Sequence, residues 1–275
     1  MPLKIAAFTM AHNEHRMLPL WMRHYSRMLG SENIFLIDHG SDDGSTDPFA
    51  DNRLRLPRKY NGADLRLPIV SGIQRTLLQE YDVVIYTDCD EFLVVDPDKY
   101  SSLEVALENH QDKYIRCLGA NIVHIPSREP GDLDFDKPIL EQRQYWYYIK
   151  SICKPIITRA EADWVPGFHF VRGMEGLRPN PAFLLLHMRW ADRAHALDRM
   201  RMTRTMEWSP KAMKLGWGAH ARQTDDEVLQ FFRGKEVESS RDGHQFIGEL
   251  MDDVGEPERI EGPVRQVYSR LRSIF

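Results

Sequence analysis

The chain has 275 residues, a length at which one large α/β domain or two small domains can each bury a substantial core. Hydrophobic residues make up 42% of it and charged residues 28%, which is a globular composition and excludes a disordered chain. The net charge of −5 argues against nucleic-acid binding, which normally needs a basic excess. A small phosphorylated ligand remains compatible with this charge, because one local basic or metal site is enough to bind it.

Cysteine spacing and hydropathy point to a reducing, aqueous setting. Cys89, Cys117 and Cys153 show no CxxC spacing, so neither a disulfide framework nor a structural zinc site is predicted. The N-terminus turns polar at His12, and no later window approaches eighteen consecutive apolar residues. We therefore expect a cytoplasmic protein without a secretion signal or a transmembrane helix.

Alternating apolar runs and amphipathic segments predict a parallel sheet in the first half. Residues 3–9 and 33–38 are short apolar runs typical of buried strands, and 14–29 between them repeats apolar residues every four positions, as a helix does. Residues 71–80 are predicted to form a second helix and 82–87 a third strand. The predicted fold class is α/β, with a mostly parallel central sheet flanked by helices.

Beyond residue 113 this regularity is lost. The candidate strands are 114–118, 121–125, 151–158 and 183–187, with an aromatic segment at 144–149, and the candidate helices are 191–208, 225–233 and 264–274. Thr224 and Glu227 have the spacing of a capping box for the helix that follows them. The last helix would be short, basic and amphipathic, with Arg265, Arg270 and Arg272 giving weak peripheral attraction to anionic lipid.

Polar clusters follow three of the predicted strands. They are Asn13-Glu14, the segment 38–43 and the segment 88–91. Because ligands of open α/β sheets bind at the carboxyl ends of the strands, these clusters are expected to converge on one crevice. The third cluster carries Asp88 and Asp90, whose oxygens suit Mn²⁺ or Mg²⁺. Solvated carboxylates at a strand exit are the alternative, but the apolar runs on both sides make unpaired charge costly there.

Taken in order, these motifs resemble the glycosyltransferases of the GT-A fold, in particular a family-2-like bacterial group with an Asp-x-Asp-Glu-Phe motif. The matching residues are Asn13-Glu14, Trp21, His24-Tyr25, Asp38-x-Gly40-Ser41-x-Asp43-Gly44-Ser45 and Asp88-Cys89-Asp90-Glu91-Phe92-Leu93. The match is good over residues 3–95 and loose beyond them. The resemblance implies a nucleotide-diphosphate sugar donor, expected to be a UDP-sugar, a divalent metal, a glycan or glycoconjugate acceptor, and a setting in polysaccharide biosynthesis.

The resemblance also implies a division of the chain. Residues 1–190 would form the glycosyltransferase domain, in which 1–112 bind the nucleotide sugar and 113–190 bind the acceptor. Residues 191–275 would form a C-terminal helical extension.

Roles for individual residues follow from the same resemblance. Asp38 would contact the base or ribose, Asp88 the ribose or sugar hydroxyls, and Asp90 the metal, with Glu91 nearby. Asp88 is also predicted as a metal ligand. His39 departs from the family pattern of Asp or Asn, which leaves the base open. For Asp38 the alternative is an Asx turn or a helix cap.

Two further sets of residues have binding and structural interpretations of similar weight. Asn13 and Glu14 could hydrogen-bond a nucleobase or ribose, or Glu14 could simply favour a helix N-terminus. His187, which closes the apolar run 183–186, is the predicted third metal ligand, with His169 as its competitor. A satisfied core histidine is the alternative for His187.

An inverting transfer also needs a general base for the acceptor hydroxyl. Asp163 is predicted for this role because it precedes a segment rich in glycine and aromatic residues. His169, Glu161, Glu175 and Asp192 are alternatives, and a solvated loop acid is the structural interpretation of each carboxylate.

Other side chains could support binding. The aromatic candidates for sugar stacking, which could equally be core, are Trp146, Tyr147, Trp164, Phe168 and Trp190, and the basic candidates for a phosphate clamp are Lys150, Lys154, Arg189, Arg193 and Arg199. A nucleotidyltransferase or phosphohydrolase is the rival enzyme class, although residues 11–15 lack the glycines of a phosphate loop. A non-catalytic nucleotide-sugar-binding protein is the rival from outside enzymes.

Overall fold

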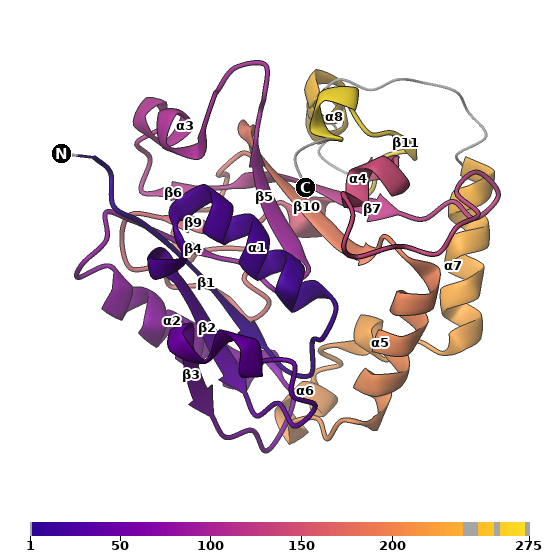
Figure 1. The fold of residues 1–275 in the computed structure, drawn as a ribbon, viewed down its shortest axis with the longest axis horizontal. Helices are drawn as coiled ribbons and strands as arrows, with labels where there is room; N and C mark the ends of the chain where they lie inside the picture. The colour runs from indigo at the N-terminus through magenta and orange to yellow at the C-terminus, as the bar shows by residue number, and fades with distance from the viewer. Residues whose placement is uncertain (1, 239–246, 256–258, 273–275) are drawn as a thin grey trace.

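A six-stranded sheet in the order β3-β2-β1-β4-β9-β6 lies at the centre of the fold, which a computed structural model describes over residues 2–238, 247–255 and 259–272 (Figure 1). Its strands are β1 (Ile5–Ala11), β2 (Ile34–His39), β3 (Arg53–Leu56), β4 (Val83–Tyr86), β6 (Tyr114–Ile115) and β9 (Ile157–Thr158). The first four run parallel, whereas β9 is antiparallel to both β4 and β6. The predicted α/β class with a mostly parallel central sheet is confirmed.

Two helices cover opposite faces of this sheet. Side chains alternate along β1, so that Ala7 packs in one core cluster with Trp21 of α1 (Met17–Leu29), and Phe8 packs in another with Val70 of α2 (Ala63–Leu77). The helix predicted at 71–80 therefore begins earlier and ends at Leu77. Pro68 lies inside α2, beyond its first turn, where it removes one backbone hydrogen bond of the helix.

A second sheet, in the order β11-β8-β7-β10-β5, was not predicted as a unit. Its strands are β5 (Glu91–Val95), β7 (Cys117–Val123), β8 (Tyr145–Tyr148), β10 (Asn180–Trp190) and β11 (Arg265–Gln266). Only β7 and β10 pair in parallel. The long strand β10 lies between β7 and β5, so that His187 is in register with both Asn121 and Glu91. This pairing brings the second half of the chain to the end of β4.

The C-terminal region is helical, as predicted. Its helices are α5 (Arg193–Thr205), α6 (Pro210–Lys214), α7 (Asp225–Glu238) and α8 (Ile247–Gly255). Shorter elements are α3 (Leu103–Asn109), α4 (Ile139–Gln142) and the 3₁₀ helices η1 (Ser31–Asn33), η2 (Asp47–Asn52), η3 (Lys150–Ile152), η4 (Ala219–Ala221) and η5 (Ser269–Leu271). The capping box is confirmed: the backbone N–H of Glu227 donates to Thr224 Oγ1 at 3.2 Å, and that of Thr224 donates to Glu227 Oε2 at 2.7 Å.

The helix predicted at 264–274 is wrong over its described part, which forms β11 and η5 instead. Strand pairing with β8 competes successfully with helix formation here. Arg265 pairs with Asp253 at 3.3 Å, and Arg270 pairs with Asp98. The basic helical face on which weak membrane contact was predicted is therefore not formed.

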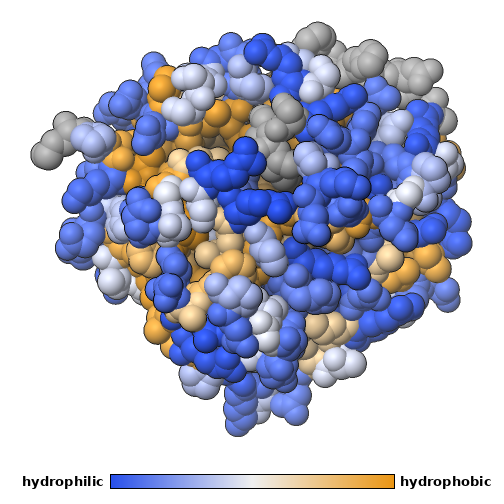
Figure 2. Space-filling view, viewed as in Figure 1, coloured by the Kyte–Doolittle hydropathy of each residue, from blue (hydrophilic) through white to orange (hydrophobic). Residues whose placement is uncertain are grey.

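The surface and the helices have ordinary hydropathy. Figure 2, which has the same view as Figure 1, shows hydrophilic residues over most of the visible surface and hydrophobic residues exposed in separate areas. None of the described helices is long and apolar enough to cross a membrane.

Candidate active site

A cavity of about 640 Å³ opens at the carboxyl ends of β1, β2 and β4. Glu14 after β1, His39 at the end of β2 and Asp88 to Glu91 after β4 line it, together with residues of β10 and α5. This is the edge where open α/β sheets bind ligands, and the volume suits a small organic ligand. Each of the three predicted polar clusters therefore places at least one side chain in this cavity.

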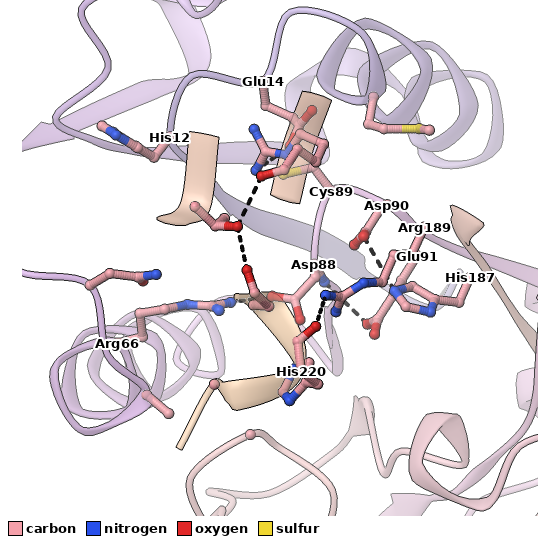
Figure 3. Close-up of a pocket in the computed structure, with 18 of the residues that line it drawn as sticks. His12, Glu14, Arg66, Asp88, Cys89, Asp90, Glu91, His187, Arg189 and His220 are labelled. Carbon is pink, nitrogen blue, oxygen red and sulfur yellow. Dashed lines mark hydrogen bonds and ion pairs between the residues drawn. The ribbon is translucent and has the colours of Figure 1, made fainter. Parts of the chain in front are cut away.

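Asp90 and His187 face each other on one side of this cavity (Figure 3). The distance between Asp90 Oδ2 and His187 Nε2 is 3.2 Å. Burial alone would raise the pKa of Asp90, but His187 holds it below its usual range. Asp90 is thus an anion in the folded protein, and its oxygen points at an imidazole nitrogen.

The other ring nitrogen of His187 fixes the chemistry of this pair. Asn121 donates through Nδ2 to the hydroxyl oxygen of Tyr147 at 2.7 Å, which leaves Asn121 Oδ1 to accept from His187 Nδ1 at 2.6 Å. With its proton on Nδ1, a neutral His187 presents the lone pair of Nε2 to the carboxylate of Asp90. Two lone pairs at this distance need a cation between them, either a proton or a metal ion.

This donor set fits a divalent metal. An imidazole whose second nitrogen donates to a carbonyl oxygen is the usual form of a metal-binding histidine. Mg²⁺ and Mn²⁺ at phosphate sites commonly take one or two protein ligands and fill the remaining positions with substrate oxygens and water. Among the described residues no group of three or more His, Cys, Asp and Glu side chains is arranged to hold a metal ion. Asp88 does not join Asp90 and His187 in the structure.

Asp88 is instead neutralised by two cations. Arg66 of α2 pairs with its Oδ1, which also accepts from the Tyr86 hydroxyl at 3.0 Å, and Lys154 lies 3.2 Å from its Oδ2. Lys154 also pairs with the buried carboxylate of Glu91. Burial alone would raise the pKa of Asp88, but Arg66 and Lys154 lower it. The i and i+2 carboxylates of the motif therefore have different partners, because the turn after β4 points them to different walls.

Asp38 does not line the cavity. Its carboxylate is fully buried and accepts from the backbone N–H of Ser41 at 2.8 Å, from Thr46 Oγ1 at 3.0 Å and from Arg55 at 3.1 Å. Burial opposes its charge, but the bonds from Ser41 and Thr46 and the charge of Arg55 lower its pKa. The Asx-turn interpretation of Asp38 describes these contacts, and the neighbouring His39 lines the cavity instead.

Asn13 and Glu14 also differ, because only Glu14 lines the cavity. The Asn13 side chain exchanges hydrogen bonds with Asp42 at 2.7 and 2.9 Å, and it does not line the cavity. Glu14 does line it, is 6% exposed and pairs with Arg199 of α5 at 2.8 Å. Burial, only partly offset by Arg199, raises the pKa of Glu14 to about 7.

His169 lines the cavity in a form suited to accept a proton. Its Nδ1 is 2.6 Å from the carbonyl oxygen of Ser151, which can only accept, so Nδ1 carries the proton and Nε2 has the free lone pair. Burial, with help from Lys154, lowers the pKa of His169 to about 4. Gly167 permits this placement, because a Cβ at Gly167 would lie 2.8 Å from His169 Nε2, and its φ of +93° suits glycine.

The carboxylates proposed as bases lie elsewhere. The side chain of Asp163 is 73% exposed, 3.4 Å from Arg172, and outside the cavity lining. Asp192 caps α5 by accepting from His195 N at 2.7 Å. Glu161 pairs with Arg75 on the surface at 3.0 Å, and Glu175 is exposed. Asp163, Glu161 and Glu175 are exposed acids, as the alternative interpretation describes, whereas Asp192 is a buried helix cap.

Some of the aromatic and basic candidates line the cavity, and others do not. Trp190 lines the cavity, whereas Trp146, Trp164 and Phe168 are core residues. Of the basic candidates, Lys154, Arg189 and Arg199 line it, and Lys150 and Arg193 do not. The residues that the sequence analysis missed are His12, Arg58, Arg66, His195 and His220. Two of these had a signal in the sequence: His12 lies just after the first predicted strand, and Arg58 lies in the loop that follows β3.

Sequence comparisons find no match: no protein-family model and no curated protein matches the chain. Similar solved structures include the mannosyltransferase PcManGT from Pyrobaculum calidifontis with GDP-Man and Mn²⁺ (12% identity, TM-score 0.37, 92% of this chain and 79% of that one). They also include S. aureus TarS with UDP (15%, 0.34, 57% and 47%) and a mannose-1-phosphate geranyltransferase from Thermus thermophilus (12%, 0.31, 97% and 74%). These matches are too distant to assign a function, so the side chains of the site must support it.

Proposed function

We propose that this protein is a metal-dependent glycosyltransferase of the GT-A type, which moves a sugar from a nucleoside diphosphate, with UDP expected, onto a glycan or glycoconjugate with inversion. The observation that carries the proposal is the Asp90 and His187 pair, a carboxylate and an imidazole 3.2 Å apart that a metal ion could bridge, at the carboxyl edge of a mostly parallel sheet. A diphosphate bound there would complete the coordination of that cation.

Asp90 and His187 would hold Mn²⁺ or Mg²⁺, which when bound neutralises charge on the leaving diphosphate. Asn121 keeps the His187 ring in the required tautomer and orientation. Asp88 lies beside the pair, fixed by Arg66 and Lys154, where its oxygens can accept from sugar or ribose hydroxyls. Rigid partners on both walls hold these groups in place before the ligand binds.

His169 is the general base in this proposal. Its Nε2 takes the proton of the acceptor hydroxyl as that oxygen bonds to the anomeric carbon. The bond from the anomeric carbon to the diphosphate oxygen breaks, and its electron pair leaves with the diphosphate. Attack from the side opposite the leaving group inverts the anomeric centre. The lowered pKa of His169 keeps the ring neutral but weakens it as a base, so its role rests on the free lone pair of Nε2 in the cavity.

All three predicted parts of the chain contribute residues to the lining of the cavity. Residues 1–112 supply Glu14, Asp88 and Asp90, and residues 113–190 supply His169 and His187. The C-terminal extension also contributes, because α5 lines the cavity. We propose that 1–112 bind most of the donor and 113–190 the acceptor, with β10 reaching the donor's metal and diphosphate and α5 closing the site.

The test is a panel of nucleotide sugars, measured first by thermal stabilisation with and without Mn²⁺ and then by turnover with glycan acceptors. Ligand binding raises apparent stability by mass action, so the correct donor should raise Tm more with metal than without it. His169→Gln should lower turnover about 100-fold or more while leaving donor binding unchanged. Donor binding without turnover on any acceptor would instead indicate a non-catalytic binding protein.

A further inference from the structure

Two arginines that line the cavity have no carboxylate partner among the residues that the structure describes. Arg58 reaches only the sulfur of Met206, at 3.2 Å. Arg189 donates to the carbonyl oxygen of His220 at 2.7 Å and stacks on the ring of Trp190 at 5.3 Å. Each guanidinium has five N–H donors, so most of the donors on both side chains remain available to a ligand.

The fold aims both side chains at the cavity. Arg58 follows β3 and packs close to the turn after β2, where a Cβ at Gly40 would lie 2.9 Å from the Cβ of Arg58. Gly40 has φ of +73° and leaves room for this approach. Arg189 lies two residues beyond His187 on β10, at the register shift between His187 and Trp190, and both side chains line the cavity. Figure 3 shows Arg189 and Arg66 entering the cavity from opposite sides of Asp88.

Arg199 is another arginine that lines the cavity, besides Arg58 and Arg189. Burial and then the charges of Arg66 and Arg199 lower the pKa of Arg58 to about 10. Arg199 itself is occupied, because it pairs with Glu14 at 2.8 Å. Of these three arginines that line the cavity, only Arg199 pairs with a carboxylate among the described residues.

The charged side chains that line the cavity include more cations than carboxylates. The cationic side chains are Arg58, Arg66, Lys154, Arg189 and Arg199, and the carboxylates are Glu14, Asp88, Asp90 and Glu91. Arg66 and Lys154 are paired with carboxylates of this set, as is Arg199. Excess positive charge in a half-buried space is costly unless an anion joins it.

We propose that Arg58 and Arg189 form a diphosphate-binding subsite that works without a metal ion, each guanidinium taking oxygens of the bound diphosphate. Guanidinium groups match phosphate oxygens through paired N–H donors, which makes them suited to this ligand. The inference rests on the proposed function for the source of the diphosphate, which is the sugar donor and the leaving group. Arg189 lies beside His187, so this subsite would adjoin the metal-binding pair.

The test is calorimetric titration of the full chain with inorganic pyrophosphate in the presence of a chelator. Wild type should bind, and Arg58→Gln and Arg189→Gln should each weaken the Kd about tenfold or more. Arg75→Gln is the matched control, because Arg75 lies on α2 outside the cavity and pairs with Glu161 on the surface. It should bind as wild type does.

Circular dichroism shows whether each variant is folded, and Arg58→Lys and Arg189→Lys replace any glutamine variant that is not. Lysine keeps the charge but loses the paired donors, so it should still weaken binding. No binding by wild type in chelator, or equal binding by wild type and the cavity variants, overturns the subsite. Sugar transfer without chelator-resistant pyrophosphate binding overturns the subsite alone. Pyrophosphate binding with no transfer to any acceptor supports the subsite and rejects the proposed function.

Discussion

Asp38 lies at the end of β2 and Asp90 just beyond the end of β4, two neighbours of β1 in the same sheet, yet only Asp90 faces the cavity. The partners of Asp38 are Ser41, Thr46 and Arg55, which follow it closely along the chain. The partner of Asp90 is His187, which arrives from β10 in the other sheet.

This difference separates a structural acid from a functional one. A carboxylate that its own turn satisfies has no oxygen left for a ligand, and it contributes to stability. A carboxylate whose partner comes from a distant strand lies where two parts of the chain meet, and its site can admit a ligand between them. Four substitutions test this distinction.

The largest effect is expected at Asp90. Asp90→Asn keeps the volume but removes the anion that faces His187, so metal-dependent donor binding should be lost and turnover should fall at least about 100-fold. Thermal unfolding should show an intact fold, because the Asp90 side chain is 31% exposed. Calorimetric titration with UDP, with and without Mn²⁺, measures the effect. Unchanged Mn²⁺-dependent binding in this variant would reject the metal assignment.

Asp38→Asn should have the opposite profile. It removes a fully buried charge that accepts three hydrogen bonds, and we expect a loss of about 2 kcal/mol in the free energy of unfolding. Urea denaturation measures this loss, and donor binding by the folded variant should stay close to that of wild type. Weaker donor binding at unchanged stability would place Asp38 in the donor site, as the sequence resemblance implied.

His39, beside Asp38, makes the end of β2 sensitive to acid. Burial and then the charges of Arg58 and Arg66 lower its pKa from 6.5 to about 4. The unfolded chain therefore takes up the proton first, so the stabilisation is complete above about pH 6.5 and is lost as the pH falls towards 4. In urea denaturation over this range, His39→Asn should reduce the acid-induced loss by about 1 kcal/mol. An identical pH dependence in the two proteins would show that His39 is protonated equally in both states.

The sheet that carries these acids could be predicted from local periodicity, because β1, α1, β2 and β4 each bury a regular set of side chains. The second sheet could not. Its strands are short or pair over long distances, and β10 meets β5 and β7 only through contacts far apart in the sequence.

The same limit applies to the site. The acids after β4 and His187 were predicted because apolar runs precede them. Arg66 was missed because Pro68 concealed the start of α2, and the role of Arg199 needs the packing of α5 against the end of β1, which only the fold supplies. The local pattern also could not show that residues just after Asp38 would hydrogen-bond its carboxylate.

The smallest effect is expected at Asp163, which extends the comparison to an acid that neither its turn nor a distant strand has buried. Asp163→Asn should leave turnover unchanged and should alter the free energy of unfolding by less than about 0.5 kcal/mol. The reason is exposure: the side chains of Asp163 and its partner Arg172 are 73% and 65% exposed, so water already solvates both charges. Steady-state kinetics with the best donor and acceptor, alongside His169→Gln, measures the contrast. A large drop in turnover for Asp163→Asn with an unchanged His169→Gln would reverse the assignment of the base, because Asp163 would then have to reach the acceptor in a conformation that differs from this one.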